Sequence, residues 1–163
     1  MFTKTNNRLM DKFVGFLRYD LKKSLNMYTA VLAIVPIVFF TYIAFALNLA
    51  QMGLQEYFYK SPITAVMFIV CLVDWIVAYV LFFQRDVLMN SSKSMVYVFT
   101  VLSIAQLAVG NLISFVLGII VLYLSKDIRS NDNKLNKNFM YLLIGCTPLY
   151  TISALFLINM GIH

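Results

Sequence analysis

Apolar residues in this chain come in four long runs, and polar residues gather in short stretches between them. The runs cover residues 28–48, 63–83, 95–124 and 139–159. A helix needs roughly 20 residues to cross the hydrocarbon core of a bilayer, so each run is long enough to span it. Continuous apolar runs predict helices, because strands of a membrane β-barrel alternate apolar and polar side chains. The pattern predicts an all-α, polytopic membrane protein with a four-helix transmembrane bundle.

The first 26 residues follow a different, amphipathic pattern. Leu9, Phe13 and Leu17 recur at helical spacing, while the cations fall largely elsewhere on the turn. Such a helix lies in the membrane interface, with its cations near anionic headgroups. We predict an interfacial helix over residues 1–26, with a solvated arm as the alternative, and one domain over residues 1–163.

The third run, residues 95–124, has two possible folds. As one helix it would be about 45 Å long, which is generous for a hydrocarbon core about 30 Å thick. As two helices hinged at Gly110-Asn111, each half would reach only about 20 Å and would span only by thinning the bilayer. Length therefore favours one tilted helix, and the hairpin stays open as the alternative.

The distribution of charge favours the hairpin. The chain carries 13 Lys and Arg against 7 Asp and Glu, and the cytoplasmic loops of membrane proteins collect Lys and Arg. With four spans and an inside N-terminus, eight of these cations lie inside and five outside, whereas a hairpin gives twelve against one. Because helix length follows from backbone geometry and the charge rule is statistical, we predict four spans.

Composition narrows the class of function. Only 12% of residues are charged and 61% are hydrophobic, whereas soluble domains carry about 25% charged residues. The Lys and Arg flank the apolar runs, so we expect lipid headgroups as their partners and no nucleic acid. Cys71 and Cys146 fall inside apolar runs, where cysteines behave as small hydrophobes. We predict an integral protein of the bacterial cytoplasmic membrane.

Motifs for enzymatic or metal chemistry do not stand out in the sequence. The single histidine is His163, and neither a His-Glu-x-x-His nor a Gly-x-Ser-x-Gly motif occurs. We therefore predict that the protein is not an enzyme and binds no cofactor or metal.

Asp74 interrupts the second apolar run in the stretch CLVDWIV. It is twelfth in that run, near the expected bilayer midplane, and no Lys or Arg lies within any predicted span to pair with it. An ionised, unpaired carboxylate at this depth costs at least ~2.5–3.5 kcal/mol on insertion scales. We therefore expect Asp74 to face inward, toward polar groups on neighbouring helices.

Polar and small residues at similar depth supply such neighbours. Candidates include Thr41 in the first run and Tyr150 in the last. The predicted intramembrane polar cluster is Asp74, Gln106, Asn111, Thr147 and Thr151. A stripe with four-residue spacing follows Gln106, and stripes of this kind let helices approach closely. The predicted packing residues of this stripe are Gly110, Ser114 and Gly118.

Two kinds of function fit this pattern. The polar cluster either fixes helix register by hydrogen bonds or binds a proton or cation in a small carrier or channel. The apolar faces and the packing stripe favour a non-enzymatic binding, accessory or protective (immunity-type) subunit for another membrane component, by analogy of size and architecture. A homo-oligomer would use the same stripe. The alternative is an ion- or proton-coupled transporter or channel that uses Asp74 with Gln106 and Asn111.

Overall fold

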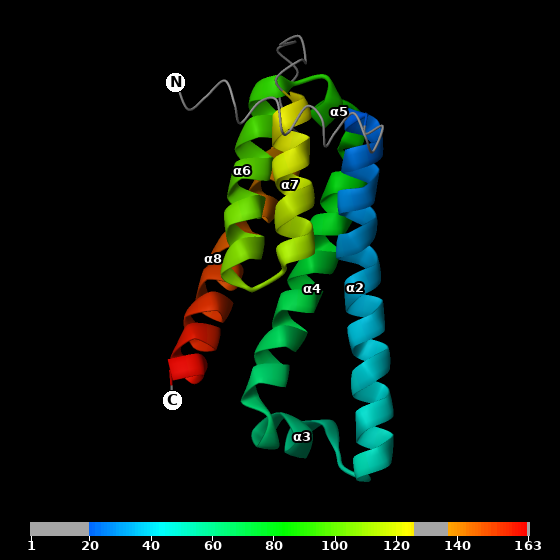
Figure 1. Cartoon of the computed structure of the whole chain (residues 1–163), viewed down its shortest axis with the longest axis vertical. Helices are drawn as coiled ribbons and strands as arrows, with labels where there is room; N and C mark the ends of the chain where they lie inside the picture. Colours follow the sequence, from blue (N-terminus) through cyan, green and yellow to red (C-terminus); the bar gives the residue numbers. More distant parts are fainter. Residues whose placement is uncertain (1–19, 126–136, 163) are drawn as a thin grey trace.

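The computed structural model describes residues 20–125 and 137–162, and this part of the chain is helical throughout except for short turns (Figure 1). Within it, three helices are long and apolar enough to cross a membrane. The prediction of an all-α, membrane-embedded protein is confirmed for the described residues. The helices are α2 (Leu21–Ala50), α3 (Leu54–Lys60), α4 (Pro62–Phe83), α5 (Arg85–Met89), α6 (Ser92–Ala108), α7 (Leu112–Leu124) and α8 (Lys137–Ile162).

Helix α2 contains the first predicted span and begins before it. The Asp20 side chain caps the helix by accepting a hydrogen bond from the Leu21 N–H at 2.8 Å, which satisfies one of the free donors of the first turn. Residues 1–19 of the predicted interfacial helix lie outside the described residues. Residues 21–26 form the first turns of α2, so the predicted boundary at residue 26 is wrong.

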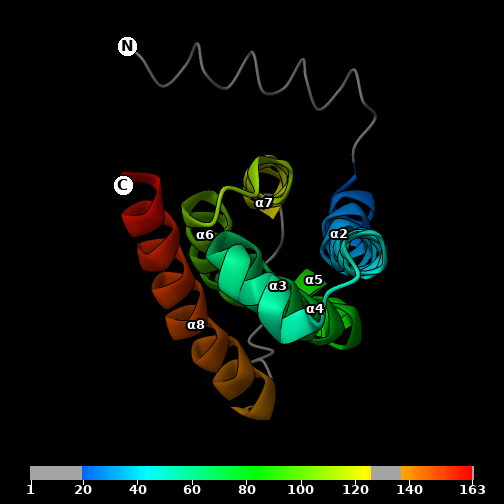
Figure 2. The same cartoon turned by 90° about the horizontal axis from the view of Figure 1, so that it is seen from below.

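Helix α4 returns through the bundle after a short turn and the seven-residue helix α3. Pro62 is its first residue, a position where the missing N–H would have no helical partner. The helix contains the second predicted span, residues 63–83. Helix α3 packs against α4 at the end of the bundle where α2 finishes, as the view from below shows (Figure 2).

The third apolar run is a hairpin of two helices, which corrects the prediction of one helix over residues 95–124. Helix α6 ends at Ala108 and α7 begins at Leu112. Gly110 between them has φ +81°, a left-handed conformation that glycine adopts without steric cost. The Asn111 side chain then caps α7 by accepting a hydrogen bond from the Ser114 N–H at 3.2 Å. Neither α6 nor α7 is among the three described helices that are long enough to cross a membrane, so the four-span count is not confirmed.

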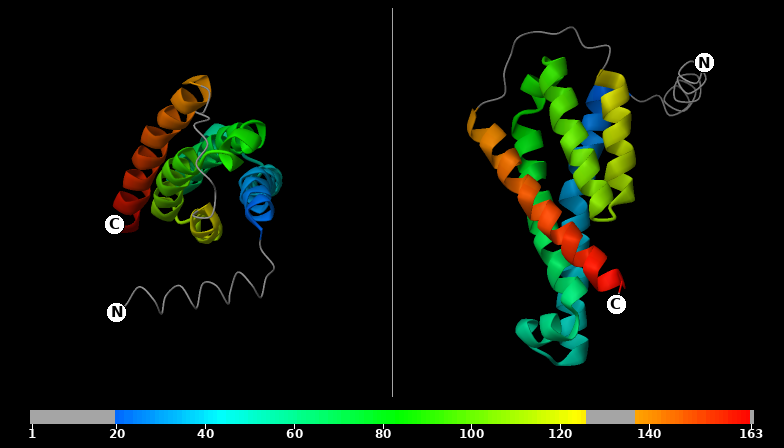
Figure 3. Two further views of the ribbon diagram at one scale, coloured as in Figure 1. Left: turned by 90° about the horizontal axis from the view of Figure 1, so that it is seen from above. Right: turned by 90° about the vertical axis from the view of Figure 1, so that its left-hand side faces the viewer.

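The hairpin is too short to cross the molecule. Helices α6 and α7 have 17 and 13 residues, or about 25 and 20 Å at the usual rise. Their connecting turn lies partway along α2 and α4 (Figures 1 and 3). Both outer ends of the hairpin lie at the end of the bundle where α2 begins, which we call the N-terminal end. Helix α8, which contains the predicted span 139–159, starts at this end and runs obliquely (Figure 3).

The packed helix pairs close a ring. Helix α2 packs against α4 and α7, α8 packs against α4 and α6, and α6 packs against α7. Buried residues of α4 begin at Val70 and continue to Leu81, so its core face lies alongside the hairpin. The interior of the ring is where the polar residues of the second and third apolar runs can meet.

Candidate functional site

Asp74 is buried inside the ring and held by two neighbouring helices. Its side chain is 2% exposed. Its Oδ1 accepts a hydrogen bond from the Tyr150 hydroxyl at 2.5 Å and another from Gln106 Nε2 at 2.7 Å. Gln106 Nε2 also lies 3.1 Å from the Tyr150 hydroxyl oxygen. We call Asp74, Gln106 and Tyr150 the Asp74 network; it joins α4, α6 and α8.

Helical spacing and the hairpin turn place these three side chains together. Cys71, Asp74 and Ala78 lie on one buried face of α4, as their separations of three and four residues require. Gln106 lies two residues before the end of α6. The hydrogen bond from Gln106 to Asp74 shows that this end of α6 lies at the depth of Asp74. Tyr150, two residues after Pro148 in α8, completes the network from the third side.

The network contains no cation. The ion pairs of Lys60 with Glu56 and of Arg85 with Asp86 both lie near helix ends, away from Asp74. The Asp74 carboxylate faces only neutral donors and interacts electrostatically with the Tyr28 hydroxyl and the Cys71 thiol. Hydrogen bonds to an ionised carboxylate are about twice as strong as neutral ones. The network can therefore stabilise the ionised carboxylate of Asp74, or let Asp74 bind and release a proton. Its three side chains do not form an activated nucleophile.

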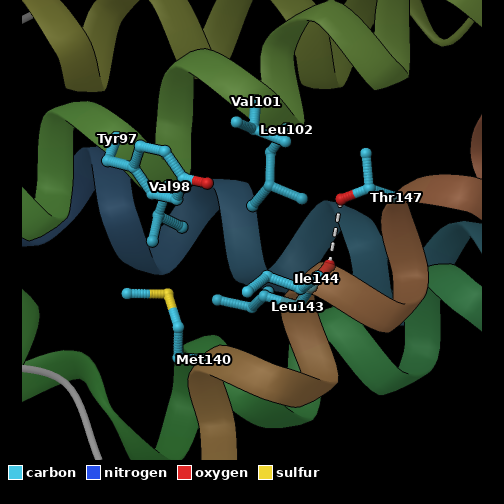
Figure 4. Close-up of a pocket in the computed structure, with 8 residues that line it drawn as sticks. All are labelled: Tyr97, Val98, Val101, Leu102, Met140, Leu143, Ile144 and Thr147. Atoms are coloured by element: carbon cyan, nitrogen blue, oxygen red, sulfur yellow. Dashed lines mark hydrogen bonds between the residues drawn. The ribbon is translucent and has the colours of Figure 1, made fainter. Parts of the chain in front are cut away.

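Three predicted members of the polar cluster lie outside the network. Asn111 caps α7. Thr151 donates its hydroxyl hydrogen bond to the Pro148 carbonyl of its own helix at 2.8 Å. Thr147 donates to the Leu143 carbonyl at 3.1 Å and lines a small, largely apolar cleft between α6 and α8 (Figure 4). Bonds of Ser and Thr to their own helix commonly compete with bonds across helices.

The predicted packing stripe has two residues at the contact between helices, Ser114 and Gly118, and one in the hairpin turn, Gly110. Gly118 lies so close to α6 and α2 that an added Cβ would collide with Ser103 Oγ and touch Tyr28 Cε2 at 3.4 Å. Ser114 is fully buried. Gly110 instead lies in the hairpin turn, with nothing within 4 Å of an added Cβ. Gly110 therefore serves the turn, and the prediction that it packs helices is wrong.

Sequence reasoning missed two features of the interior. Tyr28 is fully buried and packs edge-on against Phe99, with ring centroids 5.0 Å apart. The indole N–H of Trp75 donates to the Ala33 carbonyl of α2 at 3.0 Å. That bond ties α4 to α2. The sequence offered no signal for it, because the acceptor is a backbone carbonyl.

The comparisons with known proteins assign no function to this chain. The chain matches no family model, no curated protein and no solved structure. Among the described residues, no group of three or more His, Cys, Asp and Glu could hold a metal ion. The features of this chain that bear on function are the hairpin, the Asp74 network and the surfaces that the bundle exposes.

Proposed function

We propose that this protein is a non-enzymatic integral membrane subunit that binds another membrane component, in an accessory or protective (immunity-type) role. The observation that supports this function best is the exposed tip of the α6–α7 hairpin. The tip lies at a depth where a bilayer offers its backbone no hydrogen-bond partners.

The depth of the tip follows from the Asp74 network. Asp74 lies nine residues before the end of α4, or about 14 Å from the N-terminal end of the bundle. Gln106 lies at the same level as Asp74, because the two side chains share a hydrogen bond. Gly110 is four residues further along the chain, or about 6 Å deeper. The far end of α4 at Pro62 is then about 12 Å beyond the tip. The tip therefore lies inside the hydrocarbon core.

The tip exposes non-helical backbone and apolar side chains at that depth. Leu112 is 61% exposed and Ile113 is 63% exposed, and Gly110 beside them is exposed as well. Irregular backbone at membrane depth is tolerated where protein covers it or where it lines a water-filled cavity. The exposed side chains of the tip are apolar, so they favour contact with a partner protein over contact with a water-filled cavity.

Charge supports an orientation for this surface. At the N-terminal end the described helices carry Lys22, Lys23, Arg85 and Lys93, whereas Lys60 lies at the far end. Lys and Arg collect on the cytoplasmic side of membrane proteins. We propose that the N-terminal end faces the cytoplasm of a bacterial cell and that the tip docks its partner from the outer half of the bilayer.

Photo-crosslinking tests the docking role. A photoreactive residue at Leu112 should give a discrete protein adduct in intact cells, and that partner should co-purify in mild detergent. The same residue at Ile144, an exposed position on α8, is the matched control and should give lipid adducts only. Adding Ile113→Trp at the exposed neighbouring position to the protein with the photoreactive residue at Leu112 should abolish the adduct and the co-purification together. Lipid adducts alone at Leu112 would contradict the docking role.

Transport is the second candidate, and Asp74 favours it. A carboxylate near mid-depth with no cationic partner is a default candidate for proton or cation binding, and Gln106 contacts it directly. Asn111 does not contribute, because its side chain caps α7. In reconstituted vesicles, Asp74→Asn should abolish any proton or cation flux that the wild type shows. Flux that survives this substitution would remove the transport candidate.

A further inference from the structure

Five buried oxygen atoms on three helices have no hydrogen-bond partner within the described residues. One is the side-chain carbonyl oxygen of Gln106, and the other four are hydroxyls. The residues that carry them are at most 3% exposed. We call this set the polar seam: Ser24, Tyr28, Ser103, Gln106 and Ser114.

The residues of the polar seam lie along the inner walls of α2, α6 and α7. Ser24 and Tyr28 are one turn apart on α2, and Ser103 and Gln106 are about one turn apart on α6. Gly118 brings the three helices together, because it lies against both Ser103 and Tyr28.

The antiparallel hairpin sets the position of Ser114. Gly118 on α7 lies opposite Ser103 on α6, so Ser114, one turn nearer the tip, lies near the level of Gln106. The Gln106 amide in turn donates to Asp74 through Nε2. The polar seam therefore begins near the N-terminal end of α2 and ends at the Asp74 network.

Leaving these atoms without partners would be expensive. A buried polar group without a hydrogen bond costs about 1–3 kcal/mol, and the free energy of unfolding of a whole protein is only about 5–15 kcal/mol. Folded proteins satisfy such groups with ordered water molecules, which typically make about three hydrogen bonds each. We propose that bound water molecules occupy the polar seam and hydrate the Asp74 network from the N-terminal end of the bundle.

The hydration is one-sided. Neither α3 nor the part of α4 before Val70 carries a buried, unpartnered side-chain atom among the described residues. The titratable groups that face Asp74 are Cys71 on α4, Tyr28 on α2 and Tyr150 on α8. Water in the polar seam would therefore let Asp74 exchange its proton with the N-terminal side alone. Water at these interior oxygens does not depend on docking at the hairpin tip.

Replacing one hydroxyl tests whether the seam is wet or dry. If water bonds Ser114, Ser114→Ala should lower the melting temperature of the full-length protein in detergent. If the seam is dry, the same substitution removes an unpartnered group and should raise the melting temperature. Ser125→Ala is the matched control: Ser125 follows the last residue of α7 and is equally buried, and its hydroxyl donates to the Leu122 carbonyl at 2.8 Å. The control should lower the melting temperature in either case. An unchanged or raised melting temperature for Ser114→Ala would overturn the proposal.

Radiolytic hydroxyl-radical labelling of the wild-type protein gives a second test that needs no variant. Radicals formed from bound water modify side chains beside that water, even where bulk solvent does not reach. Tyr28 should be modified although it is fully buried. Met95, equally buried and outside the polar seam, should be protected although its sulfur is intrinsically reactive. Protection of Tyr28 to the same extent as Met95 would overturn the proposal.

Discussion

The two ends of the bundle are both built from largely apolar helices, and their packing is very different. Toward the N-terminal end, α2 up to Pro36 and α4 from Val70 onward lie beside the hairpin, and Leu25 and Leu32 are fully buried. We call this region the packed half. Beyond Pro36, α2 runs beside α4 alone among the long helices, and α3 lies at the far end (Figure 1). Phe45 and Leu49 there are 64% and 71% exposed. We call this region the open half.

The difference shows what holds a membrane protein together. Lipid tails are as apolar as leucine, so burial of apolar surface does not by itself drive helices together in a bilayer. The packed half instead combines a close-approach glycine, Gly118, with hydrogen bonds at Asp74. The open half is joined by aromatic contacts: the Phe68 ring lies 5.2 Å from that of Phe40 and 5.3 Å from that of Phe58 between centroids. Substitutions in the packed half should therefore cost more stability.

The largest effect is expected at Gly118. A leucine there would enter the space held by Ser103 and Tyr28, and overpacking of this kind costs about 1–3 kcal/mol or more. Gly118→Leu should lower the melting temperature in detergent sharply or prevent folding. Gly145→Leu, on an open face of α8 with nothing within 4 Å, should have almost no effect. Equal losses in the two variants would contradict the distinction between the halves.

The Asp74 network should give the second-largest effect. Asp74→Leu leaves the donors of Gln106 and Tyr150 without their acceptor, and each intramembrane hydrogen bond contributes about 0.6–2 kcal/mol. The free energy of unfolding should fall by about 2 kcal/mol. Asp74→Asn keeps a carbonyl acceptor and should lose less.

A double-mutant cycle sharpens this expectation. Adding Gln106→Leu to Asp74→Leu should cost less than the two single substitutions together, because both remove the same bond. Additive losses would mean that the 2.7 Å contact between these side chains carries little energy.

Substitutions in the hairpin turn should cost less stability than substitutions at Gly118, where α7 packs against α6 and α2. Gly110 has φ +81°, and side chains other than glycine pay about 1–2 kcal/mol in the left-handed region. Gly110→Ala should therefore lower the free energy of unfolding by about this amount. Gly53→Ala is the control, since Gly53 has φ −74° and open space around it. A harmless Gly110→Ala would mean that the turn tolerates another backbone conformation.

The smallest effect is expected where the two halves meet. Trp75→Phe keeps a ring against Phe40 and loses the hydrogen bond to the Ala33 carbonyl, so the cost should be about 0.6–1 kcal/mol. Thr41→Val in the open half removes only a bond within α2 and should change the melting temperature less. The reverse order would show that the open half is held more tightly than its contacts suggest.

Much of the fold could be predicted from hydropathy alone, and the hairpin could not. Apolar runs locate α2, α4 and α8 because each is long and apolar enough to cross the hydrocarbon core. The run 95–124 is long enough to span, but it turns back at Gly110-Asn111. The expectation of one helix assumed that every apolar run crosses the bilayer. The twelve-to-one distribution of cations indicated the hairpin correctly, because both of its outer ends lie at the N-terminal end.

The candidate site could be predicted only in part. Depth along the chain brought Asp74 and Gln106 into one cluster and placed Tyr150 in the same layer. Depth says nothing about which way a hydroxyl turns, so Thr147 and Thr151 were included although each bonds a carbonyl of its own helix. Tyr28 was missed because an aromatic residue at the start of a span is typical of a membrane interface.

The central claim is that residues 90 and 138 are joined by a hairpin. It is tested most directly by finding the side of the membrane on which each of these two residues lies. Single cysteines at Asn90, Asn138 and Gln55 would be probed with an impermeant thiol reagent in right-side-out and inside-out vesicles, in a background that lacks Cys71 and Cys146. The hairpin predicts that Asn90→Cys and Asn138→Cys react from one side of the membrane and Gln55→Cys from the other. Reaction of Asn138→Cys from the side of Gln55→Cys would contradict the hairpin and restore a fourth span.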